Sequence, residues 1–370
     1  MESDNKLFLL DAYALIYRAY YAFIKNPRIN SKGFNTSAIL GFVNTLEEVL
    51  KKENPSHIGV AFDPSGPTFR HEAFEQYKAQ REETPEAIRL SVPIIKDIIH
   101  AYRIPILEVA GYEADDVIGT LATEAGRQGI TTYMMTPDKD YGQLVTDNVF
   151  MYRPKHTGGF EVMGIEEVKA KFDIQSPAQV IDMLGLMGDA SDNIPGCPGV
   201  GEKTAQKLIA EFGSIENLLE HTDQLKGALK TKVETNKELI TFSKFLATIK
   251  IDVPIQLEMD KLVREQADED SLRQIFEELE FRTLIDRVLK KENSAGGVTM
   301  ATGSKTATAK SAPSPLPLFP EEGGAIQGDL FANFTGNEAG EAKKSNLETL
   351  ETLNCDYQLI DTEKKRAEII

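Results

Sequence analysis

The sequence predicts an α/β fold, with a mostly parallel sheet covered by helices on both faces, followed by an all-helical domain. In the first half of the chain, short apolar runs alternate with longer stretches of helical periodicity. Each apolar run ends on an aspartate or shortly before one. From about residue 176 onward the strand signal fades, and the amphipathic segments there are typical of helices. Apolar strands separated by helices form parallel sheets that are buried on both faces.

The predicted strands share a feature at their carboxyl ends. They are the apolar runs at residues 7–10, 58–62 and 131–135, and the helices around and between them span residues 36–51, 85–102 and 114–127. Asp11, Asp63 and Asp138 stand at or just past the strand ends, which is where ligands bind in sheets of this kind. Aspartate is also a common turn residue, but that explanation suits one such position better than three.

The second half of the chain predicts a separate helical domain. Its amphipathic segments are residues 203–212, 214–220, 226–249 and 269–290, with Gly213 as a helix stop. We therefore predict an α/β domain at residues 1–175 and a helical domain at residues 176–292. Residues 293–345 are rich in Gly, Ala, Ser, Thr and Pro, which predicts a flexible linker. Residues 346–370 regain apolar and helical patterns, and we interpret them as the truncated start of a further domain.

Composition limits the class of protein. With 41% hydrophobic and 27% charged residues, the chain is typical of a globular protein with a sizeable core. Its two cysteines, Cys197 and Cys355, show no paired spacing, so neither a disulfide framework nor a zinc site is indicated. The sequence shows no secretory signal and no apolar run of membrane length. We expect a monomer in the reducing cytoplasm.

The charge of the chain opposes binding to nucleic acid. The net charge is −17, whereas phosphate binding is strengthened by Lys and Arg. The distribution is uneven, however, because six lysines between Lys226 and Lys250 stand against only Glu234 and Glu238. A run of this kind is more often a solvated helix face than a binding surface, so alone it decides nothing.

Acidic residues recur in close groups along the chain. The carboxylates that we select as candidate metal ligands are Asp11, Asp63, Glu113, Asp115, Asp116, Asp138, Asp140, Asp189 and Asp192. Crowded carboxylates repel one another unless a cation is present. Mg²⁺ prefers carboxylates and water, and Mn²⁺ shares this oxygen chemistry. Two such ions can activate a water and stabilise the leaving oxygen of a phosphodiester.

Each acidic group also has a structural explanation. The run from Glu113 to Asp116 suits a helix start because of the helix dipole, and Asp138 and Asp140 are compatible with a turn. Taken singly, each group favours structure over metal binding. Their joint placement at strand ends favours the metal hypothesis, and the lack of His and Cys among them argues against zinc.

A glycine-containing loop precedes the helix that opens at Lys203. Gly199 and Gly201 permit positive φ and close backbone approach, which leaves amide N–H groups available at a helix N-terminus. Lys203 and Lys207 follow on the helix. Such a loop binds phosphate without reading bases. An ordinary interhelical turn is the alternative.

Basic and aromatic residues precede the Glu113 run. Arg70, Lys78 and Arg81 are candidates for binding the scissile phosphate and its developing charge. Tyr77 is a candidate for stacking on an unpaired base. Because basic and acidic residues balance between Arg70 and Arg103, a plain exposed helix is the alternative.

Five ordered motifs resemble one family. They are LLDAYALIYRAYYAF, AFDPSGPTFRHEAFEQYKAQR, VAGYEADDVIGTLA, TPDKDYGQLV and GDASDNIPGCPGVGEKTAQKLI. Over roughly residues 5–290 the chain resembles the 5′-nuclease domain of bacterial DNA polymerase I, which belongs with the flap endonucleases. The resemblance implies a PIN/resolvase-like α/β domain followed by a helix-hairpin-helix DNA-binding domain. It also implies that residues 346–370 begin a 3′–5′ exonuclease-like domain and that the polymerase domain is absent from this chain.

The resemblance also implies roles for individual residues. The residues that match the family's ligands for a first metal ion are Asp11, Asp63, Glu113, Asp115 and Asp116. Those that match its ligands for a second metal ion are Asp138, Asp140, Asp189 and Asp192. Lys78 and Arg81 match residues that meet the scissile phosphate, with Arg70 near them and Tyr77 as the stacking residue. Three glycines match the family's helix-hairpin-helix motif, namely Gly196, Gly199 and Gly201. In the family, this motif also holds a K⁺ ion through backbone carbonyls. The chain departs from the pattern at Ala12, where many members have glycine.

The implied function is Mg²⁺-dependent hydrolysis of phosphodiesters by two metal ions, at DNA 5′ ends, flaps, nicks and RNA primers in replication and repair. Two other hypotheses stay open at this point. A module that binds branched DNA without cutting it would keep its flap affinity in EDTA. A small-molecule phosphohydrolase on a similar sheet would leave the hairpin and the lysine-rich helices without a purpose.

Overall fold

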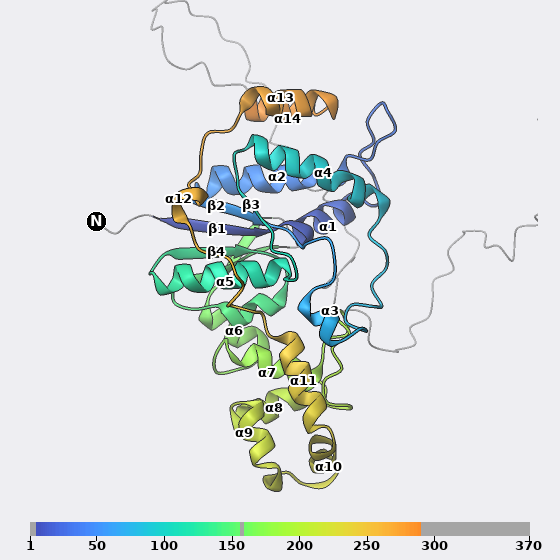
Figure 1. Cartoon of the computed structure of the whole chain (residues 1–370), viewed down its shortest axis with the longest axis vertical. Coiled ribbons are helices and arrows are strands. Elements are labelled where there is room, and N and C mark those ends of the chain that lie inside the picture. The colour runs from blue at the N-terminus through green and yellow to red at the C-terminus, as the bar shows by residue number, and fades with distance from the viewer. Residues whose placement is uncertain (1–4, 156–158, 290–370) are drawn as a thin grey trace, which may run out of the picture. The chain divides into compact units, whose positions relative to one another are not determined.

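A computed structural model of the chain describes residues 5–155 and 159–289 (Figure 1). Within these residues, six strands form one sheet in the order β3-β2-β1-β4-β5-β6. The strands are β1 (Lys6–Asp11), β2 (His57–Ala61), β3 (Ile106–Leu107), β4 (Thr131–Met135), β5 (Val149–Pro154) and β6 (Phe160–Met163). All neighbouring strands pair in parallel except β5 and β6, which pair antiparallel. The prediction of a mostly parallel sheet is confirmed.

Helices cover both faces of this sheet. The helices in this half of the chain are α1 (Ala12–Ala22), α2 (Ser37–Lys52), α3 (Phe69–Ala73), α4 (Glu86–Ala101), α5 (Ala114–Arg127), η1 (Lys139–Leu144) and α6 (Ile165–Phe172). On β1 the fully buried Leu7 and Leu9 share an apolar cluster with Ile118 of α5, whereas Phe8 and Leu10 share another with α2 and α4. Figure 1 shows α2 and α4 on one side of the strands and α5 on the other. The central strand is therefore apolar from Leu7 through Leu10 because both of its faces are covered there.

The remaining helices follow the sheet in sequence. They are α7 (Gln179–Met187), α8 (Glu202–Phe212), α9 (Ile215–Glu220), η2 (Thr222–Gln224), α10 (Gly227–Thr235), α11 (Lys237–Ala247), α12 (Met259–Leu262), α13 (Glu269–Glu278) and α14 (Arg282–Leu289). Helix α7 packs against both α8 and α11, which makes the centre of the helical part. Gly213 ends α8 with φ +80°, and its amide donates to the Ile209 carbonyl at 2.8 Å, so the predicted helix stop is confirmed.

Two of the predicted long helices are each broken in two. The segment 226–249 divides at Asn236, whose φ of −117° and ψ of 22° are not helical. Its side-chain amide donates to the Lys232 carbonyl at 2.7 Å, which satisfies the end of α10. The segment 269–290 divides at residues 279–281, where Glu280 takes φ +64°. Amphipathic periodicity continues across both breaks, so it does not reveal them.

The last helices return to the sheet. Leu272 and Phe276 of α13 lie in the same apolar cluster as Ile95 and Ile98 of α4, and α12 packs against β2. The predicted helical domain of residues 176–292 therefore extends too far, because its last helices belong to the core of the α/β part. Helical character alone does not tell which core an amphipathic helix joins.

Some predictions concern residues outside the described ranges. The linker at 293–345, the domain start at 346–370 and Cys355 all lie there. Cys197 is buried and forms no disulfide with any described residue. None of the helices in residues 5–155 and 159–289 has the length and apolar character to cross a membrane.

Candidate active site

The carboxyl ends of three neighbouring strands bring acidic side chains to one edge of the sheet. Strand β1 lies between β2 and β4, so Asp11, Asp63 and Asp138, which end or follow these strands, come together there. Asp11 is bonded on both oxygens. Its Oδ1 accepts from the Ala14 amide at 3.0 Å, and its Oδ2 accepts from Thr136 Oγ1 at 3.1 Å.

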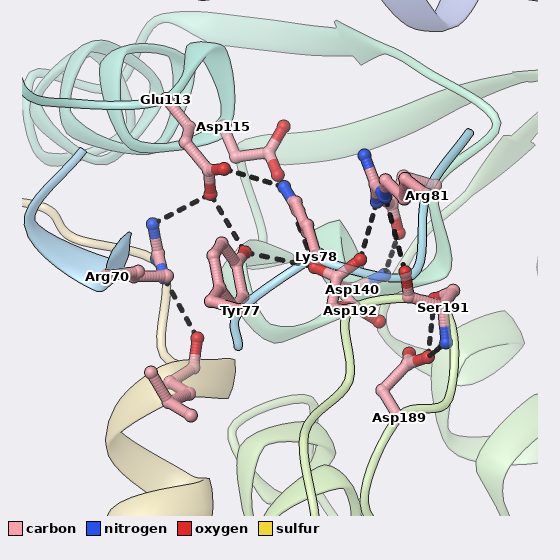
Figure 2. Close-up of polar contacts among 12 residues, drawn as sticks. Arg70, Tyr77, Lys78, Arg81, Glu113, Asp115, Asp140, Asp189, Ser191 and Asp192 are labelled. Carbon is pink, nitrogen blue, oxygen red and sulfur yellow. Dashed lines mark hydrogen bonds and ion pairs between the residues drawn. The ribbon is translucent and has the colours of Figure 1, made fainter. Parts of the chain in front are cut away.

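The amino end of α5 adds further carboxylates to this edge. Asp63 Oδ1 accepts at 2.7 Å from the amide of the first residue of α5, which joins the end of β2 to the helix. Glu113 is the N-cap of α5, and Asp116 Oδ2 accepts from its amide at 3.0 Å. Figure 2 shows Glu113 and Asp115 projecting from this helix start toward Lys78.

Arg70 is buried beside this helix start with all of its donors used. Nη1 donates to Glu113 Oε2 at 3.0 Å and to Asp116 Oδ2 at 2.8 Å, and Nη2 donates to Asp116 Oδ1 at 2.8 Å. Nε and Nη2 also donate to the carbonyls of Leu246 and Thr248, at 2.9 and 2.7 Å. A guanidinium has five N–H donors, and these bonds occupy them all. We therefore correct the prediction that Arg70 contacts the scissile phosphate, because no donor is left for it.

Asp116 is equally saturated. Besides Arg70, its Oδ1 accepts from the Lys250 amide at 2.8 Å and its Oδ2 from the Glu113 amide. The side chain is fully buried, and a carboxylate offers about four acceptor positions. We correct the prediction that Asp116 is a metal ligand, because it holds Arg70 and two amides instead.

Lys78 and Arg81 lie in the segment between α3 and α4, and their side chains reach the carboxylates Glu113 and Asp192. Lys78 Nζ lies 2.6 Å from Glu113 Oε1 and 3.7 Å from Asp192 Oδ2. Arg81 Nη2 lies 2.5 Å from Asp192 Oδ1, and 41% of the Arg81 side chain is exposed. Lys78 thus connects Glu113, at the start of α5, to Asp192, which Arg81 also contacts (Figure 2).

Tyr77 does not occupy the position that its predicted role requires. The residue is 3% exposed, and its hydroxyl lies 3.0 Å from both Glu113 Oε2 and Asp192 Oδ2. The edge of its ring meets His71, and the Lys78 ammonium lies over it. We correct the prediction that Tyr77 stacks on a base, because its ring is enclosed by the protein.

The second acidic group contains both paired and unpaired carboxylates. Asp189 Oδ2 pairs with Lys139 Nζ at 3.1 Å, and its Oδ1 accepts from the Ser191 amide at 2.7 Å. Asp138 Oδ1 accepts only the amide of Asp140, at 2.9 Å, among the described residues. Asp140 Oδ1 is buried and has no hydrogen-bond partner in the described part of the chain. A buried acceptor without a partner is costly, so this oxygen is a candidate for an additional ligand.

The pKa values separate the carboxylates into two kinds. Burial, followed by the charge of Asp63, raises the pKa of Asp11 to about 7. Burial also raises the pKa of Asp115 and of Asp140 well above the usual range, with neighbouring aspartates adding to both shifts. For Glu113, by contrast, burial is outweighed by Lys78 and Arg70, which lower its pKa. The unpaired carboxylates are thus the ones whose negative charge is most costly.

The donor set fits a hard divalent cation in its chemistry, although it is not a preformed cage. Within residues 5–155 and 159–289, no three or more His, Cys, Asp or Glu side chains are grouped so that they could hold a metal ion as they stand. All of the donors at this edge are oxygens, and Asp140 Oδ1 lacks a partner. Mg²⁺ keeps several waters and is held by one or two carboxylates together with substrate phosphates, so it does not require a closed protein cage.

The loop between α7 and α8 carries the predicted glycines. Gly196 and Gly199 have φ values of +62° and +75°, and a Cβ on Gly196 would lie 2.3 Å from the backbone nitrogen of Gly188, the residue that directly follows α7. Gly201 has φ −101° and is the N-cap of α8, so the positive φ that glycine permits is used at Gly199 and not at Gly201. Lys203 and Lys207 are exposed on α8.

The amides of this loop differ in their availability. The Gly196 amide donates to Ser243 Oγ at 2.9 Å and is therefore not free for a ligand. The amides of Gly199 and Gly201 have no partner among the described residues. Free amides at the start of a helix are suited to an anion.

The departure from the family pattern at Ala12 does not disturb the acidic cluster. Ala12 is the first residue of α1 and is fully buried. It belongs to the apolar cluster that contains Phe8 and Leu10. The added methyl group is therefore accommodated by the core.

Sequence reasoning missed several residues that bind the carboxylates. Thr136 donates to Asp11, Lys139 pairs with Asp189, and Tyr141 donates to Asp115 Oδ1 at 2.8 Å. All three stand in the run from Thr136 to Val145 that contains Asp138 and Asp140. Their nearness to these aspartates in sequence was the available signal.

Comparisons with known proteins match both halves of the described chain. The family described as 5′-3′ exonuclease, N-terminal resolvase-like domain matches residues 6–173. The family described as 5′-3′ exonuclease, C-terminal SAM fold matches residues 175–270. The boundary between the two matches agrees with the change from sheet to helices near residue 175.

Curated relatives and solved structures extend these matches. DNA polymerase I of Bacillus subtilis (strain 168) is 43% identical over 291 residues, which cover 78% of this chain and 33% of that protein. DNA polymerase I of Bacillus caldotenax is 40% identical over 287 residues, which cover 77% of this chain and 32% of that protein. The chain thus spans about a third of the length of these relatives. A bacteriophage T5 flap endonuclease, solved as a pseudo-enzyme–product complex with DNA and metal ions, shares the fold with a TM-score of 0.54 at 22% identity, covering 75% of this chain and 100% of that one.

Proposed function

Because the chain belongs to the 5′-3′ exonuclease family, we propose that it hydrolyses DNA phosphodiesters at 5′ ends and flaps with the help of divalent cations. The observation that carries this proposal is the group of buried, unpaired carboxylates at the sheet edge, beside the ammonium of Lys78. The T5 flap endonuclease that shares this fold was solved with DNA and metal ions, which supports the same ligands here.

The proposed metal ligands lie on two sides of the edge. Asp11, Asp63, Glu113 and Asp115 would hold one Mg²⁺, and Asp138, Asp140, Asp189 and Asp192 would hold a second. When bound, Mg²⁺ supplies charge stabilisation to the phosphoryl oxygens and activates water. Mn²⁺ prefers the same oxygen ligands and is expected to substitute for it.

Lys78 and Arg81 are proposed to bind the scissile phosphate. Lys78 is held between Glu113 and Asp192 and is 16% exposed in its side chain. A divalent cation near these carboxylates would compete with the ammonium for their charge and release it toward phosphate. Arg81 is more exposed and presents a planar donor group suited to phosphate.

The hairpin before α8 is proposed to bind the DNA backbone away from the cut. Its free amides, with Lys203 and Lys207 on the same helix, offer contacts to phosphate that do not depend on base sequence. A K⁺ ion held by loop carbonyls would strengthen this contact. Local amides and lysines thereby answer the objection raised by the net charge of −17.

The wider setting follows from the relatives. We propose that the chain acts as the front part of a DNA polymerase I, as a monomer in the cytoplasm, on flaps, nicks and RNA primers during replication and repair. Within this proposal, the polymerase and 3′–5′ exonuclease-like domains belong to the two thirds of these relatives that this chain does not match.

The test is cleavage of a 5′-labelled flap by the purified chain. We expect release of the labelled flap with Mg²⁺, no release in EDTA, and loss of cleavage in Asp140→Asn. Flap binding in EDTA without turnover in any divalent metal would instead show a non-cleaving binding module. Cleavage that persists in both EDTA and Asp140→Asn would contradict the proposed site.

A further inference from the structure

Tyr141 is the largest of the fully buried side chains in the described part of the chain. It lies on η1, directly after Asp140. Its ring packs in the apolar cluster that contains Leu7, Leu9 and Ala114. The side chain has no exposed surface, so it does not meet DNA directly.

The hydroxyl of Tyr141 is the polar end of this buried ring. It donates to Asp115 Oδ1 at 2.8 Å, and Asp115 is its partner among the described residues. Burial and the nearby Asp115 charge keep the pKa of Tyr141 well above its usual value, so the hydroxyl stays a donor. A buried hydroxyl is costly unless it is bonded. Phenylalanine would fill the same apolar space without this cost, so the hydroxyl calls for a role at Asp115.

The bond joins two separate parts of the carboxylate cluster. Asp115 lies on α5, whereas Asp140 and Tyr141 lie on η1, the element after β4 whose N-cap is Asp138. Because the hydroxyl holds Oδ1 of Asp115, the rotation of that carboxylate is restricted and Oδ2 is left for another partner. Outer bonds of this kind orient metal-binding side chains in general.

We propose that Tyr141 is a positioning residue for metal binding, which orients Asp115 toward the divalent cation that it would share with Asp11, Asp63 and Glu113. This inference rests on the proposed function, because it assumes that the cluster binds such a cation. Loss of the Tyr141 hydroxyl should therefore weaken metal binding and leave the affinity for DNA unchanged.

The test compares two buried tyrosines. In Tyr141→Phe the hydroxyl at Asp115 is removed. The control Tyr102→Phe removes a hydroxyl that donates to Glu47 Oε1 at 2.6 Å, from a ring that is 5% exposed in the other apolar cluster. Mn²⁺ binding to the full chain is measured without DNA by calorimetry and by the spin resonance signal of free Mn²⁺, beside flap affinity in EDTA and thermal melts.

We expect Tyr141→Phe to bind Mn²⁺ about 10-fold more weakly or worse, with flap affinity unchanged. Tyr102→Phe should keep wild-type Mn²⁺ affinity. In the background of Asp115→Asn, the Tyr141→Phe change should cause little further loss, because the two act through one contact.

The outcomes separate this inference from the proposed function. If the wild-type chain binds no Mn²⁺ and cleaves no flap with any divalent metal, both are overturned. If it cleaves the flap but binds no Mn²⁺ in the absence of DNA, only the role of Tyr141 is overturned. If it binds Mn²⁺ and Tyr141→Phe binds equally well, only the role of Tyr141 is overturned. Equal weakening in both phenylalanine variants would likewise overturn it, because the effect would then come from lost stability.

Discussion

The carboxylates at the sheet edge form two sets with opposite surroundings. The paired set is Glu113, Asp116, Asp189 and Asp192, and each member contacts Arg70, Lys78, Arg81 or Lys139 within 3.1 Å. The unpaired set is Asp11, Asp63, Asp115, Asp138 and Asp140, whose side chains contact amides, hydroxyls or no partner among the described residues.

The difference shows how one edge serves both folding and chemistry. Asp116 has its charge balanced by Arg70, which also holds the end of α11 to the start of α5. Asp115 and Asp140 have no such balance, and burial raises their pKa values. Within the paired set, Asp116 therefore belongs to the scaffold with Arg70, whereas the unpaired set keeps its full capacity for a cation.

The largest effect is expected from breaking the Arg70–Asp116 pair. Arg70→Met leaves Asp116 buried without its counter-charge, and we expect a loss of about 3–5 kcal/mol in the free energy of unfolding. Arg81→Met, which removes a more exposed partner of Asp192, should cost about 1 kcal/mol or less. Denaturant unfolding measures both free energies. Equal losses in the two variants would contradict the view that the buried Arg70–Asp116 pair stabilises the fold more than the exposed Arg81–Asp192 pair.

Removing an unpaired carboxylate should affect activity instead. Asp140→Asn is expected to lower flap cleavage roughly 100- to 1,000-fold, because several kcal/mol of metal-dependent stabilisation are lost. In EDTA the variant should be at least as stable as wild type, since the cost of burying an ionisable carboxyl group is gone. Rates in Mg²⁺ and melts in EDTA test this, and a destabilised but active variant would reverse the assignment.

The two sets should also respond to pH in different ranges. Asp11 has its pKa raised from 3.8 to about 7, so between these values the folded protein holds a proton that the unfolded chain does not. In EDTA its contribution to stability is therefore full below about pH 4 and is lost as the pH rises toward 7. The pKa values of Glu113 and Asp192 are lowered, so their contribution is present at neutral pH and is lost as the solution becomes acidic.

Melts in EDTA between about pH 3 and pH 7.5 measure this difference, because the acid loss from Glu113 and Asp192 lies below their ordinary pKa values. Asp11→Asn should flatten the decline toward neutral pH by an amount on the order of a few kcal/mol. The acid loss that comes from the paired set should persist in this variant. A wild-type stability that rises steadily to pH 7.5 would be inconsistent with a protonated Asp11.

A smaller effect than that of Arg70→Met is expected at Tyr77, which bonds to the paired set. Tyr77→Phe keeps the buried ring and removes the hydroxyl shared by Glu113 and Asp192. We expect a loss of about 1–3 kcal/mol in the free energy of unfolding and unchanged flap affinity in EDTA. A flap affinity that falls while stability is kept would restore a direct DNA role for Tyr77.

Much of the fold and the outline of the site could be predicted from the sequence. The runs that contain Leu7–Leu10, Ile58–Phe62 and Thr131–Met135 are strands because apolar runs of this length need burial on two faces. Parallel pairing then places Asp11, Asp63 and Asp138 at one edge. These steps depend on local pattern and on a general rule of topology.

The division into paired and unpaired carboxylates could not be predicted in the same way. Two of the donors of Arg70 bind the carbonyls of Leu246 and Thr248, about 176 residues further along the chain. No pattern in the sequence around Arg70 predicts such a distant contact. The return of α13 onto α4 is hidden for the same reason, since an amphipathic stripe does not identify its partner. The backbone of Gly201 also depends on its neighbours, because glycine permits either sign of φ.

The most direct test of the difference between the two sets is whether Mg²⁺ binding releases protons. Calorimetric titration of the wild-type chain with Mg²⁺ near pH 6.5, in buffers with different heats of ionisation, measures this number. Because the raised pKa values leave members of the unpaired set protonated without metal, we expect release on the order of one proton per chain. Binding heats that are the same in every buffer would contradict it.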